Sequence, residues 1–477
     1  MTRAGRTAVT GVAVVALSAA LVWAQGRGGG EGPRERKRES QDRVGGVPAN
    51  ILKLQSTEEV KPPSIDEAVD VARKAARAAA LPLIDTKFHK GQRLVVPDEF
   101  KTIQNAIDAA RSGDVVIVKP GTYFELLVMK DGIKLVSDAS GGGNTLVAVE
   151  GARIKLPRRA LRTILDGSKS KPSHHGMIDF GPGVGRKTIV DGFTIQNLPA
   201  QDHHVPGHAH GLNVRGASPV IMNCYLRGNG STGIGNHVVY KDQGSAIAQR
   251  DFRWANIKHR ADAVIFNNII RDSLGLGIGC NHFSAPQILG NEVFRNSEQA
   301  GAEPTPGIGA KHGAAPTIIG NVVHDNPGGG ILSRAREPQG AHPIDKPTHP
   351  TVERNVVHRN GKGRPAISCD GGGSTRTPVR FIGNFVYDAG LAGLGLSNRA
   401  VGVIEGNVVS GSGAAGIAVN DSVALELNRN QVTGAKGPGF AIVNGARILE
   451  MVGNAADGNL GPRFLLHGGR IADPDQG

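Results

Sequence analysis

Cysteine and aromatic residues are scarce in this sequence of 477 residues. Three cysteines, an odd number, cannot form the disulfide framework that staples small secreted domains, and we expect them to be buried free thiols. Aromatic residues make up only 4% of the chain. Because proteins bind single-stranded nucleic acid largely by stacking bases on aromatic rings, this scarcity argues against a nucleic-acid partner, even at a net charge of +13.

Long apolar runs are also rare, and the clearest one lies at the N-terminus. Arg3 and Arg6 precede an apolar stretch over residues 8–22, and Val22-Trp23-Ala24 offers small residues at both positions that signal peptidase reads. This pattern predicts a secretory signal peptide over residues 1–24, with an uncleaved anchor as the alternative. No other segment reaches membrane-spanning length. We therefore expect a secreted or periplasmic protein without membrane contact after signal cleavage.

Composition divides the rest of the chain into three parts. Residues 25–62 begin with a Gly-rich, mixed-charge stretch almost without apolar side chains, which predicts a disordered linker. Residues 63–95 should form a short helical segment, because Ser64 and Glu67 have the spacing of a capping box and Ala-rich turns follow. Residues 96–470 carry a repeat and form the main domain.

Glycine and asparagine, in contrast, are abundant, and they punctuate this repeat. Its unit has two apolar residues, a variable residue, Asn, two more apolar residues, two variable residues, then Asn or Ser, and finally Gly-Ile or Gly-Leu. A unit with a period of about 23 residues cannot bury a core alone and must stack on its neighbours. The pattern predicts an all-β fold, the right-handed parallel β-helix. The anchor positions are Cys224, Asn268, Asn291, Asn321, Asn355, Asn384, Asn407, Asn430 and Asn454.

The repeat also predicts which side chains face the core. Asn tolerates a left-handed backbone, and its amide can bond to the Asn of the next coil, so we expect an asparagine ladder along the solenoid. In strands such as Gly277-Ile278-Gly279-Cys280, the second and fourth residues point inward, because side chains alternate along a strand. The predicted inward set includes Ile278, Ile308, Ile367, Cys280, Ala310 and Cys369.

Residues 96–138, VPDEFKTIQNAIDAARSGDVVIVKPGTYFELLVMKDGIKLVSD, give a second signal. Thr102 is placed to cap a helix with Ile103 and Ile107 on one face, which would plug the open N-terminal end of the solenoid. The stretch closely resembles the opening shared by pectin methylesterases and other members of the pectate-lyase-like superfamily. The resemblance extends to about residue 460 and implies the fold. It does not imply one activity, because the superfamily holds lyases, esterases, hydrolases, epimerases and proteins without known catalysis.

The catalytic motifs of individual members are not recovered. Ile178-Asp179-Phe180-Gly181 is only a fragment of the paired Asp motifs of pectin methylesterases, and Asp202-His203-His204 lacks the Pro and the closing Asp of the mannuronan epimerase motif. The Asn-Thr-Asp and Asp-Asp motifs of polygalacturonase-like hydrolases do not occur. Catalytic residues therefore cannot be transferred by motif.

One outward position of the repeat carries polar and charged side chains in successive coils. It lies four residues after the corner Gly, and the outward position before it is mostly Gly or small, which predicts a flat floor. At a strand spacing of about 4.8 Å, five steps give a strip of about 24 Å. Inserted loops over residues 236–260 and 333–349 would wall a groove beside it. We call this strip the basic column; its members are Arg215, His237, Asn281, Lys311, Arg334 and Asp370.

The basic column predicts an acidic polysaccharide as partner. A lyase that cleaves a uronic-acid polymer must neutralise a carboxylate with Arg, Lys or Ca²⁺ and abstract the neighbouring proton with a Lys, Arg or His base. Lys311 and Arg334, on adjacent coils, resemble the Lys/Arg pair of alginate and chondroitin lyases with this fold, although the acidic Ca²⁺ cluster which that resemblance implies is reduced to Glu303. We expect catalysis by Lys311, Arg334 and His237, and substrate binding by Arg215, Asn281, His282, His312 and Asp370.

A His-rich run from Asp202 to His210 offers further ligands. We predict that His203, His204, His208 and His210 are the candidate ligands for Zn²⁺ or Cu²⁺. The run could equally supply a proton-transfer base, bind sugar or be a polar loop, because its spacing matches no fixed motif.

Two functions remain open from the sequence. One is a secreted lyase-type enzyme acting on an acidic polysaccharide, and the other is a non-catalytic carbohydrate-binding or surface β-helix protein. An enzyme should bring the basic column, the His-rich run and the loops into one cleft, whereas a scaffold should disperse them around the solenoid. In either case we expect a monomer.

Overall fold

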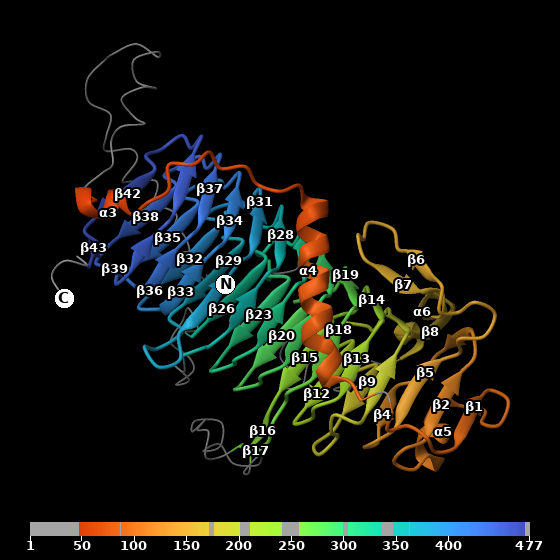
Figure 1. The fold of residues 1–477 in the computed structure, drawn as a ribbon. Helices are drawn as coiled ribbons and strands as arrows, with labels where there is room; N and C mark the ends of the chain where they lie inside the picture. Colours follow the sequence, from red (N-terminus) through yellow and green to blue (C-terminus); the bar gives the residue numbers. More distant parts are fainter. Residues whose placement is uncertain are drawn as a thin grey trace, which may run out of the picture.

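The computed structural model describes residues 47–85, 87–170, 176–200, 210–240, 257–298, 304–335, 347–361 and 363–472. Over these residues the chain winds into a solenoid of short strands, each pairing in parallel with strands of the coils before and after it (Figure 1). Successive coils contribute strands to the same three sheets, so the fold is a parallel β-helix, as the repeat predicts. The predicted signal peptide lies outside the described residues.

The three sheets run along the solenoid, and we name them A, B and C. Sheet A contains β4 (Leu127–Met129), β9 (Ile178–Phe180), β12 (Leu212–Arg215), β15 (Ile234–His237), β20 (Ile278–Asn281), β23 (Ile308–Lys311), β26 (Ile331–Arg334), β29 (Ile367–Asp370), β32 (Leu394–Ser397), β35 (Ile417–Asn420), β38 (Phe440–Val443) and β42 (Phe464–His467). Sheet B contains β1 (Arg93–Val96), β2 (Val115–Val118), β5 (Lys134–Ser137), β10 (Ile189–Asp191), β13 (Val220–Met222), β18 (Val264–Phe266), β21 (Gln287–Leu289), β24 (Thr317–Ile319), β27 (Thr351–Glu353), β30 (Val379–Ile382), β33 (Val401–Glu405), β36 (Val423–Asn428), β39 (Arg447–Ile448), β40 (Met451–Val452) and β43 (Arg470–Ile471). Sheet C contains β3 (Gly121–Tyr123), β8 (Thr163–Asp166), β11 (Thr194–Gln196), β14 (Tyr225–Arg227), β19 (Ile269–Arg271), β22 (Glu292–Phe294), β25 (Val322–His324), β28 (Val356–His358), β31 (Phe385–Tyr387), β34 (Val408–Ser410), β37 (Gln431–Thr433) and β41 (Ala455–Asp457).

Strand register places like residues above one another in the core. Between β20 and β23, Ile278 pairs with Ile308 and Cys280 with Ala310. The whole predicted inward set is buried in one continuous core: Ile278, Ile308, Ile367, Cys280, Ala310 and Cys369. The three cysteines are free and buried as expected, and burial raises the pKa of the Cys224 thiol to about 12.

The predicted asparagine ladder runs along the corner between sheets B and C. The side-chain oxygen of each Asn accepts two hydrogen bonds from the Asn one coil earlier; Asn291 Oδ1 accepts from Asn268 N at 3.0 Å and from Asn268 Nδ2 at 2.9 Å. Cys224, at the first anchor, donates its backbone N–H to Asn268 Oδ1 at 2.9 Å. The later rungs are Asn321, Asn355, Asn384, Asn407, Asn430 and Asn454.

A short helix, α5 (Ile103–Ala109), caps the N-terminal end of the solenoid, as predicted. Thr102 begins it by accepting a hydrogen bond from Asn105 N at 3.2 Å. Ile103 and Ile107 on its inner face are buried in the same core as the first strands. The helix thereby shields the apolar interior of the first coil from water.

The chain before the solenoid forms an N-terminal strap, residues 47–85, which lies along the outside of the coils (Figure 1). It begins with α3 (Ala49–Lys53) against the C-terminal coil and continues into α4 (Ile65–Ala80), which packs on sheets B and C. The capping box of Ser64 and Glu67 is present at the start of α4. Gly320 makes room for the helix, because a Cβ there would lie 2.1 Å from the Ala72 carbonyl oxygen.

Residues 25–46 of the predicted disordered linker, residues 25–62, lie outside the described residues, and the remainder of that stretch belongs to the strap. Residues 49–56 lie against the last coil, where Ile51 is buried, Leu54 O accepts a hydrogen bond from Gly453 N at 2.8 Å, and Ser56 N donates to the Asn454 carbonyl oxygen at 2.9 Å. Gln55 Oε1 accepts from both the backbone N–H and Nδ2 of Asn454, at 3.1 and 3.0 Å, and so adds a last rung to the asparagine ladder. A few apolar residues and the Gln55 amide thus hold the strap on the last coil, because the end of a solenoid exposes backbone and side-chain groups that have no next coil to pair with.

Candidate functional site

The basic column is formed at the edge of sheet A. Each member is the last residue of its strand, where the coil turns toward sheet B. Arg215 is exposed and the other members are half-buried. Ser397 takes the position after Asp370, so the charged part ends there as predicted. The register aligns Arg215 with His237, His237 with Asn281, Lys311 with Arg334, and Arg334 with Asp370.

Cations gather in the middle of the column. Lys311 and Arg334 hold paired positions on β23 and β26, about 4.8 Å apart along the sheet. Burial, and to a smaller extent the nearby charge of Arg334, lowers the pKa of Arg364. An anion bound here would relieve the repulsion among these groups.

The floor beside the basic column is not bare, in contrast to the prediction. A Cβ at Gly235 would lie 2.3 Å from the His210 ring, so this ring lies directly on Gly235. A Cβ at Gly309 would lie 2.4 Å from the Leu276 side chain, and Leu332 occupies the next place in the same row. The glycines were predicted to leave an open surface, but they accommodate side chains from neighbouring turns instead.

Two imidazoles meet at the start of the column. Nε2 of His210 lies 3.1 Å from Nε2 of His237, and the ring centroids are 5.3 Å apart with the planes inclined by 12°. At this centroid distance the two nitrogens face each other almost head on. That is the geometry of an N–H···N hydrogen bond, whereas two ligands of one tetrahedral metal would converge on a point beside them.

Of the four histidines predicted to bind a metal ion, the structure describes only His210. His203, His204 and His208 lie outside the described residues, and His210 contacts His237. Over the described part of the chain, no group of three or more His, Cys, Asp or Glu side chains is arranged to hold a metal ion. Metal binding by the run therefore stays a prediction.

His282 and His312 directly follow β20 and β23 and stack on each other. Their ring centroids are 5.1 Å apart and their planes are inclined by 13°. The His282 centroid also lies 6.4 Å from that of His237. The structure thus brings together, in a row beside Lys311, three imidazoles that the sequence indicated only one by one.

The insertion after β15 leaves the solenoid directly at the basic column. β16 (Val239–Tyr240) and β17 (Ile257–His259) form its antiparallel stem, two residues beyond His237. Residues 241–256 and 336–346, which the sequence places in the walls of a groove, lie outside the described residues. The groove walls therefore stay a prediction.

A second cluster of titratable side chains was not found from the sequence. It lies on the outer face of sheet C, beneath the hairpin of β6 (Leu146–Ala148) and β7 (Lys155–Pro157), whose turn donates backbone N–H groups to Glu292. The Glu292 carboxylate is fully buried and lies 3.0 Å from His324 Nε2, while Asp325 lies 2.7 Å from His324 Nδ1. His358 stacks on His324 with centroids 4.6 Å apart. We call this the buried histidine cluster; its members are Glu292, His324, Asp325, His358 and Arg359.

The two stacked imidazoles of this cluster have opposite proton affinities. Burial alone would lower the pKa of His324, but hydrogen bonds to Asp325 and Glu292 outweigh it and raise the pKa. Burial, reinforced by the charge of His324, lowers the pKa of His358 to about 3. Glu292, His324 and His358 are buried, whereas Asp325 is half-buried and Arg359 is exposed. The buried members pack the hairpin onto the solenoid, so the cluster is a structural element. Its sequence signal is Val-Val-His after the anchor Asn, at residues 322–324 and again at 356–358.

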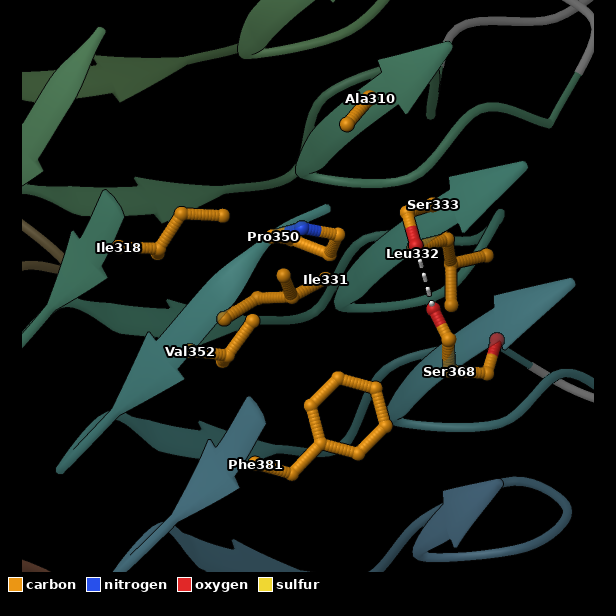
Figure 2. A pocket seen from close by; sticks show the side chains of 9 residues that line it. All are labelled: Ala310, Ile318, Ile331, Leu332, Ser333, Pro350, Val352, Ser368 and Phe381. Carbon is orange, nitrogen blue, oxygen red and sulfur yellow. Dashed lines mark hydrogen bonds between the residues drawn. The ribbon is translucent and has the colours of Figure 1, made fainter. Parts of the chain in front are cut away.

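The hollow shown in Figure 2 lies at the solenoid interior and not in the candidate site. Ile318, Ile331, Val352 and Phe381 from the core fill its surroundings, and Ser333 donates to the Ser368 carbonyl oxygen at 3.5 Å. Its lining carries no charged side chain.

In the described residues, no helix is both long enough and apolar enough to cross a membrane.

Several known proteins are similar to this chain. Residues 339–456 match the family described as "Right handed beta helix region", which gives the solenoid its hand. The catalytic unit of a GH87 alpha-1,3-glucanase from Streptomyces thermodiastaticus strain HF3-3 is 13% identical, with 88% of this chain and 72% of that chain covered, at a TM-score of 0.47. The A-module of the mannuronan C-5 epimerase AlgE4 of Azotobacter vinelandii is 12% identical over 78% of this chain and 95% of its own, at a TM-score of 0.35. PfbA, a surface adhesin of Streptococcus pneumoniae, is 13% identical over 78% of this chain and 89% of its own, at a TM-score of 0.39.

Identities this low carry no information on activity. No curated protein shows a significant match to the sequence. Residues 97–377, more than half of the chain, match the model of one further family. The chain therefore belongs to the family described as "Protein of unknown function (DUF1565)".

Proposed function

We propose that this protein binds an acidic, uronic-acid-containing polysaccharide along the basic column and cleaves it by β-elimination. The observation that carries the proposal is the pairing of Lys311 with Arg334 on β23 and β26, with two stacked imidazoles beside Lys311. A linear polymer lying along sheet A would meet one polar side chain per coil. Arg215 and Asn281 would bind neighbouring sugar units, and Asp370 would accept hydrogen bonds from hydroxyl groups.

The chemistry fits the side chains of the column. Arg334 pairs with the substrate carboxylate and stabilises the negative charge that develops when the proton on the adjacent carbon is removed. Lys311 accepts that proton, with His237 as the alternative base. The C–O bond to the leaving sugar then breaks, a carbon–carbon double bond forms, and the leaving oxygen takes up a proton. Ca²⁺ could supply the neutralising charge, but the described residues offer no acidic cluster to hold it, so no step is assigned to it.

Non-catalytic binding is the competing function, and one observation favours it. His210 and Leu276 cover the glycine floor beside the column, so the polymer would lie on a shallow surface rather than in a deep cleft. Shallow surfaces suit binding, whereas cleavage generally requires that water be excluded from the reacting atoms.

Lys311→Ala and Arg334→Ala test the proposal. Both side chains are only half-buried, so we expect the fold to be kept and cleavage to fall by roughly 100-fold or more, the usual effect of removing a general base or a charge stabiliser. Cleavage is measured by the ultraviolet absorbance of the unsaturated product on a panel of polyuronates, with and without Ca²⁺. Arg380→Ala, which removes an exposed cation from sheet B, is the matched control.

Each alternative outcome has a definite meaning. Unchanged turnover in both variants would remove Lys311 and Arg334 from the catalytic assignment. If the wild type cleaves no polymer by either absorbance or reducing-end assay but still binds one, the non-catalytic function replaces the lyase.

A further inference from the structure

The turn that leads from sheet C into sheet A carries one charged residue at a repeated position. This position is three residues before each sheet A strand, at the opposite edge of the sheet from the basic column. Its residues stack from coil to coil, since Gly437 N donates to the Ala414 carbonyl oxygen and Gly461 N to that of Gly437, each at 3.0 Å. In the described coils from β15 to β42, Arg364 is the one charged occupant. The other occupants are Ser231, Gly275, Thr305, Gly328, Leu391, Ala414, Gly437 and Gly461.

Arg364 stands in the coil next to a cation of the basic column. It precedes β29, which pairs in parallel with β26, and Arg334 at the end of β26 is aligned with Asp370 at the end of β29. Arg334 and Arg364 therefore lie on adjacent coils, at opposite edges of the same sheet. The four-residue strand between the two edges spans about 10 Å, and one coil advances the solenoid by about 4.8 Å.

The two guanidinium groups face each other without a counter-charge. Burial, and after it the nearby charge of Arg334, lowers the pKa of Arg364, so the two charges act on each other. In the part of the chain that the structure describes, neither side chain forms an ion pair or a hydrogen bond. The Asp370 carboxylate is turned to the next coil, where it accepts a hydrogen bond from Asn398 Nδ2 at 2.6 Å. Because guanidinium groups bind carboxylates through paired hydrogen bonds, both arginines suit an anionic ligand.

Between the two arginines, the outer face of sheet A is uncharged. Leu332 on β26 and Ser368 on β29 are aligned there, and both are half-buried. Leu332 offers an apolar surface to the C–H face of a sugar ring, and the Ser368 hydroxyl offers a hydrogen bond to a sugar hydroxyl. A sugar chain that follows the solenoid axis can therefore lie on this face with one arginine on each side.

The geometry of the polymer decides whether it meets both arginines. The rise per coil, about 4.8 Å, is close to the length of one sugar unit. In a β-1,4-linked chain with both linkage bonds equatorial, each ring is turned by half a turn relative to the ring before it, so successive carboxylates point to opposite sides. An α-1,4-linked galacturonate chain has axial linkage bonds and winds helically, so its carboxylates do not alternate in this way.

We propose that Arg334 and Arg364 bind the carboxylates of two successive sugar units from opposite sides, so that the substrate is a flat, β-1,4-linked polyuronate of the glucuronan type. The inference rests on the proposed binding of an acidic polysaccharide and names the substrate class of that same site. It adds Arg364, which the basic column does not contain, as a substrate-binding residue.

The test measures binding of two polymers by calorimetry at constant ionic strength. The polymers are β-1,4-glucuronan and polygalacturonate, which carry the same charge per sugar and differ in how successive carboxylates point. The parent protein is the full-length Lys311→Ala variant, because this substitution should stop cleavage during the titration. Arg364→Gln removes the charge, and Arg364→Lys keeps the charge without the paired hydrogen bonds. Arg380→Gln, which removes an exposed cation from sheet B, is the matched control.

We expect the parent and Arg380→Gln to bind glucuronan roughly tenfold more tightly than polygalacturonate. Arg364→Gln should lose that preference, with glucuronan binding weakened roughly tenfold and polygalacturonate binding nearly unchanged, and Arg364→Lys should lie between the two. Glucuronan binding that Arg364→Gln leaves unchanged, or an equal loss for both polymers, would overturn the inference while the proposed function stands. If neither the parent nor the wild type binds either polymer, the proposed function itself is overturned.

Discussion

At the scale of single residues, one local environment can fix opposite protonation states in two touching imidazoles. His324 and His358 are both nearly inaccessible, and their rings are parallel within 3°. Glu292 and Asp325 hydrogen-bond both nitrogens of His324, whereas both ring nitrogens of His358 are buried without a hydrogen-bond partner. A carboxylate partner, and not burial by itself, therefore decides which ring is charged.

This asymmetry predicts the acid sensitivity of the fold. The pKa of His358 is lowered to about 3, below the ordinary value near 6.5, so the unfolded chain binds its proton more readily than the folded one. The free energy of unfolding should then fall as the pH drops from about 6.5 toward 3, by about 2–3 kcal/mol from this residue at about pH 4.5. His358→Phe removes this pH-dependent contribution to the free energy of unfolding. It keeps an aromatic ring stacked on His324, as Phe294 is on the other face.

Urea unfolding of both proteins at about pH 7.5 and pH 4.5 checks this prediction. His324 acts in the opposite sense, because its raised pKa gives stability that is complete below about pH 6.5 and is lost as the pH rises through the folded value. The comparison with His358→Phe isolates His358, since His324 is present in both proteins. An equal loss of stability in the two proteins would contradict the assignment.

The residues of the candidate site were predictable to the extent that the repeat fixes them. Lys311 and Arg334 lie 23 positions apart in equivalent repeats, and one strand register then makes them neighbours. The contact of His210 with His237 was not predictable, because His210 enters from an insertion whose path no repeat sets. The buried histidine cluster escaped notice because its burial comes from a distant hairpin at residues 146–157.

At the scale of elements, the asparagine ladder replaces the interstrand pairing that a sharp corner lacks. Asn321 Nδ2 donates to Asn355 Oδ1 and to the Ile288 carbonyl oxygen, both near 3 Å, while its own oxygen accepts two bonds from Asn291. Every one of these groups is buried, so each would be costly to leave unpaired.

We therefore predict that Asn321→Ala lowers the free energy of unfolding by roughly 3–5 kcal/mol. The substitution removes the acceptor of the Asn291 backbone N–H and one acceptor of its side-chain amide, which keeps its hydrogen bond to the Ile265 carbonyl oxygen. It also removes the Asn321 amide that donates to the Ile288 carbonyl oxygen, and each buried group left unpaired costs about 1–3 kcal/mol. Asn105→Ala, on the exposed face of α5, is the control and should change stability by no more than about 0.5 kcal/mol. Equal effects of the two substitutions in chemical denaturation would show that the ladder contributes nothing specific.

Helices and strands could be predicted where the local sequence pattern determines them. The place where a helix packs on the solenoid could not be predicted from that pattern. The coil strands, the ladder and α5 all follow from spacing and capping residues such as Thr102. The sequence also shows that α4 has an Ala-rich face, but it does not say which coils receive it. That choice is set by Gly290 and Gly320, whose missing Cβ atoms admit Ala76 and Ala72, and this fit is visible only in three dimensions.

At the scale of the whole molecule, the N-terminal strap connects coils of the solenoid that do not contact each other directly. Coils of a repeat protein stabilise mainly their immediate neighbours, and the last coil has a neighbour on one side only. Here α3 and Gln55 supply the missing neighbour, and α4 connects that end to the middle coils (Figure 1). Terminal coils are expected to open first in such a fold, so the strap acts where the solenoid is weakest.

The last prediction follows from this arrangement. Gln55→Ala removes the acceptor for Asn454 N and Nδ2, and it should raise amide hydrogen exchange in the C-terminal coil, residues 447–471, roughly tenfold, the equivalent of about 1.4 kcal/mol of local stability. Exchange around the Asn321 rung should stay the same, because coupling decays from coil to coil. Thr57→Ala, an exposed change in the same strap, is the matched control. Faster exchange along the entire solenoid would instead mean that the strap governs global unfolding, and unchanged exchange at Asn454 would mean that Gln55 does not hold the last rung.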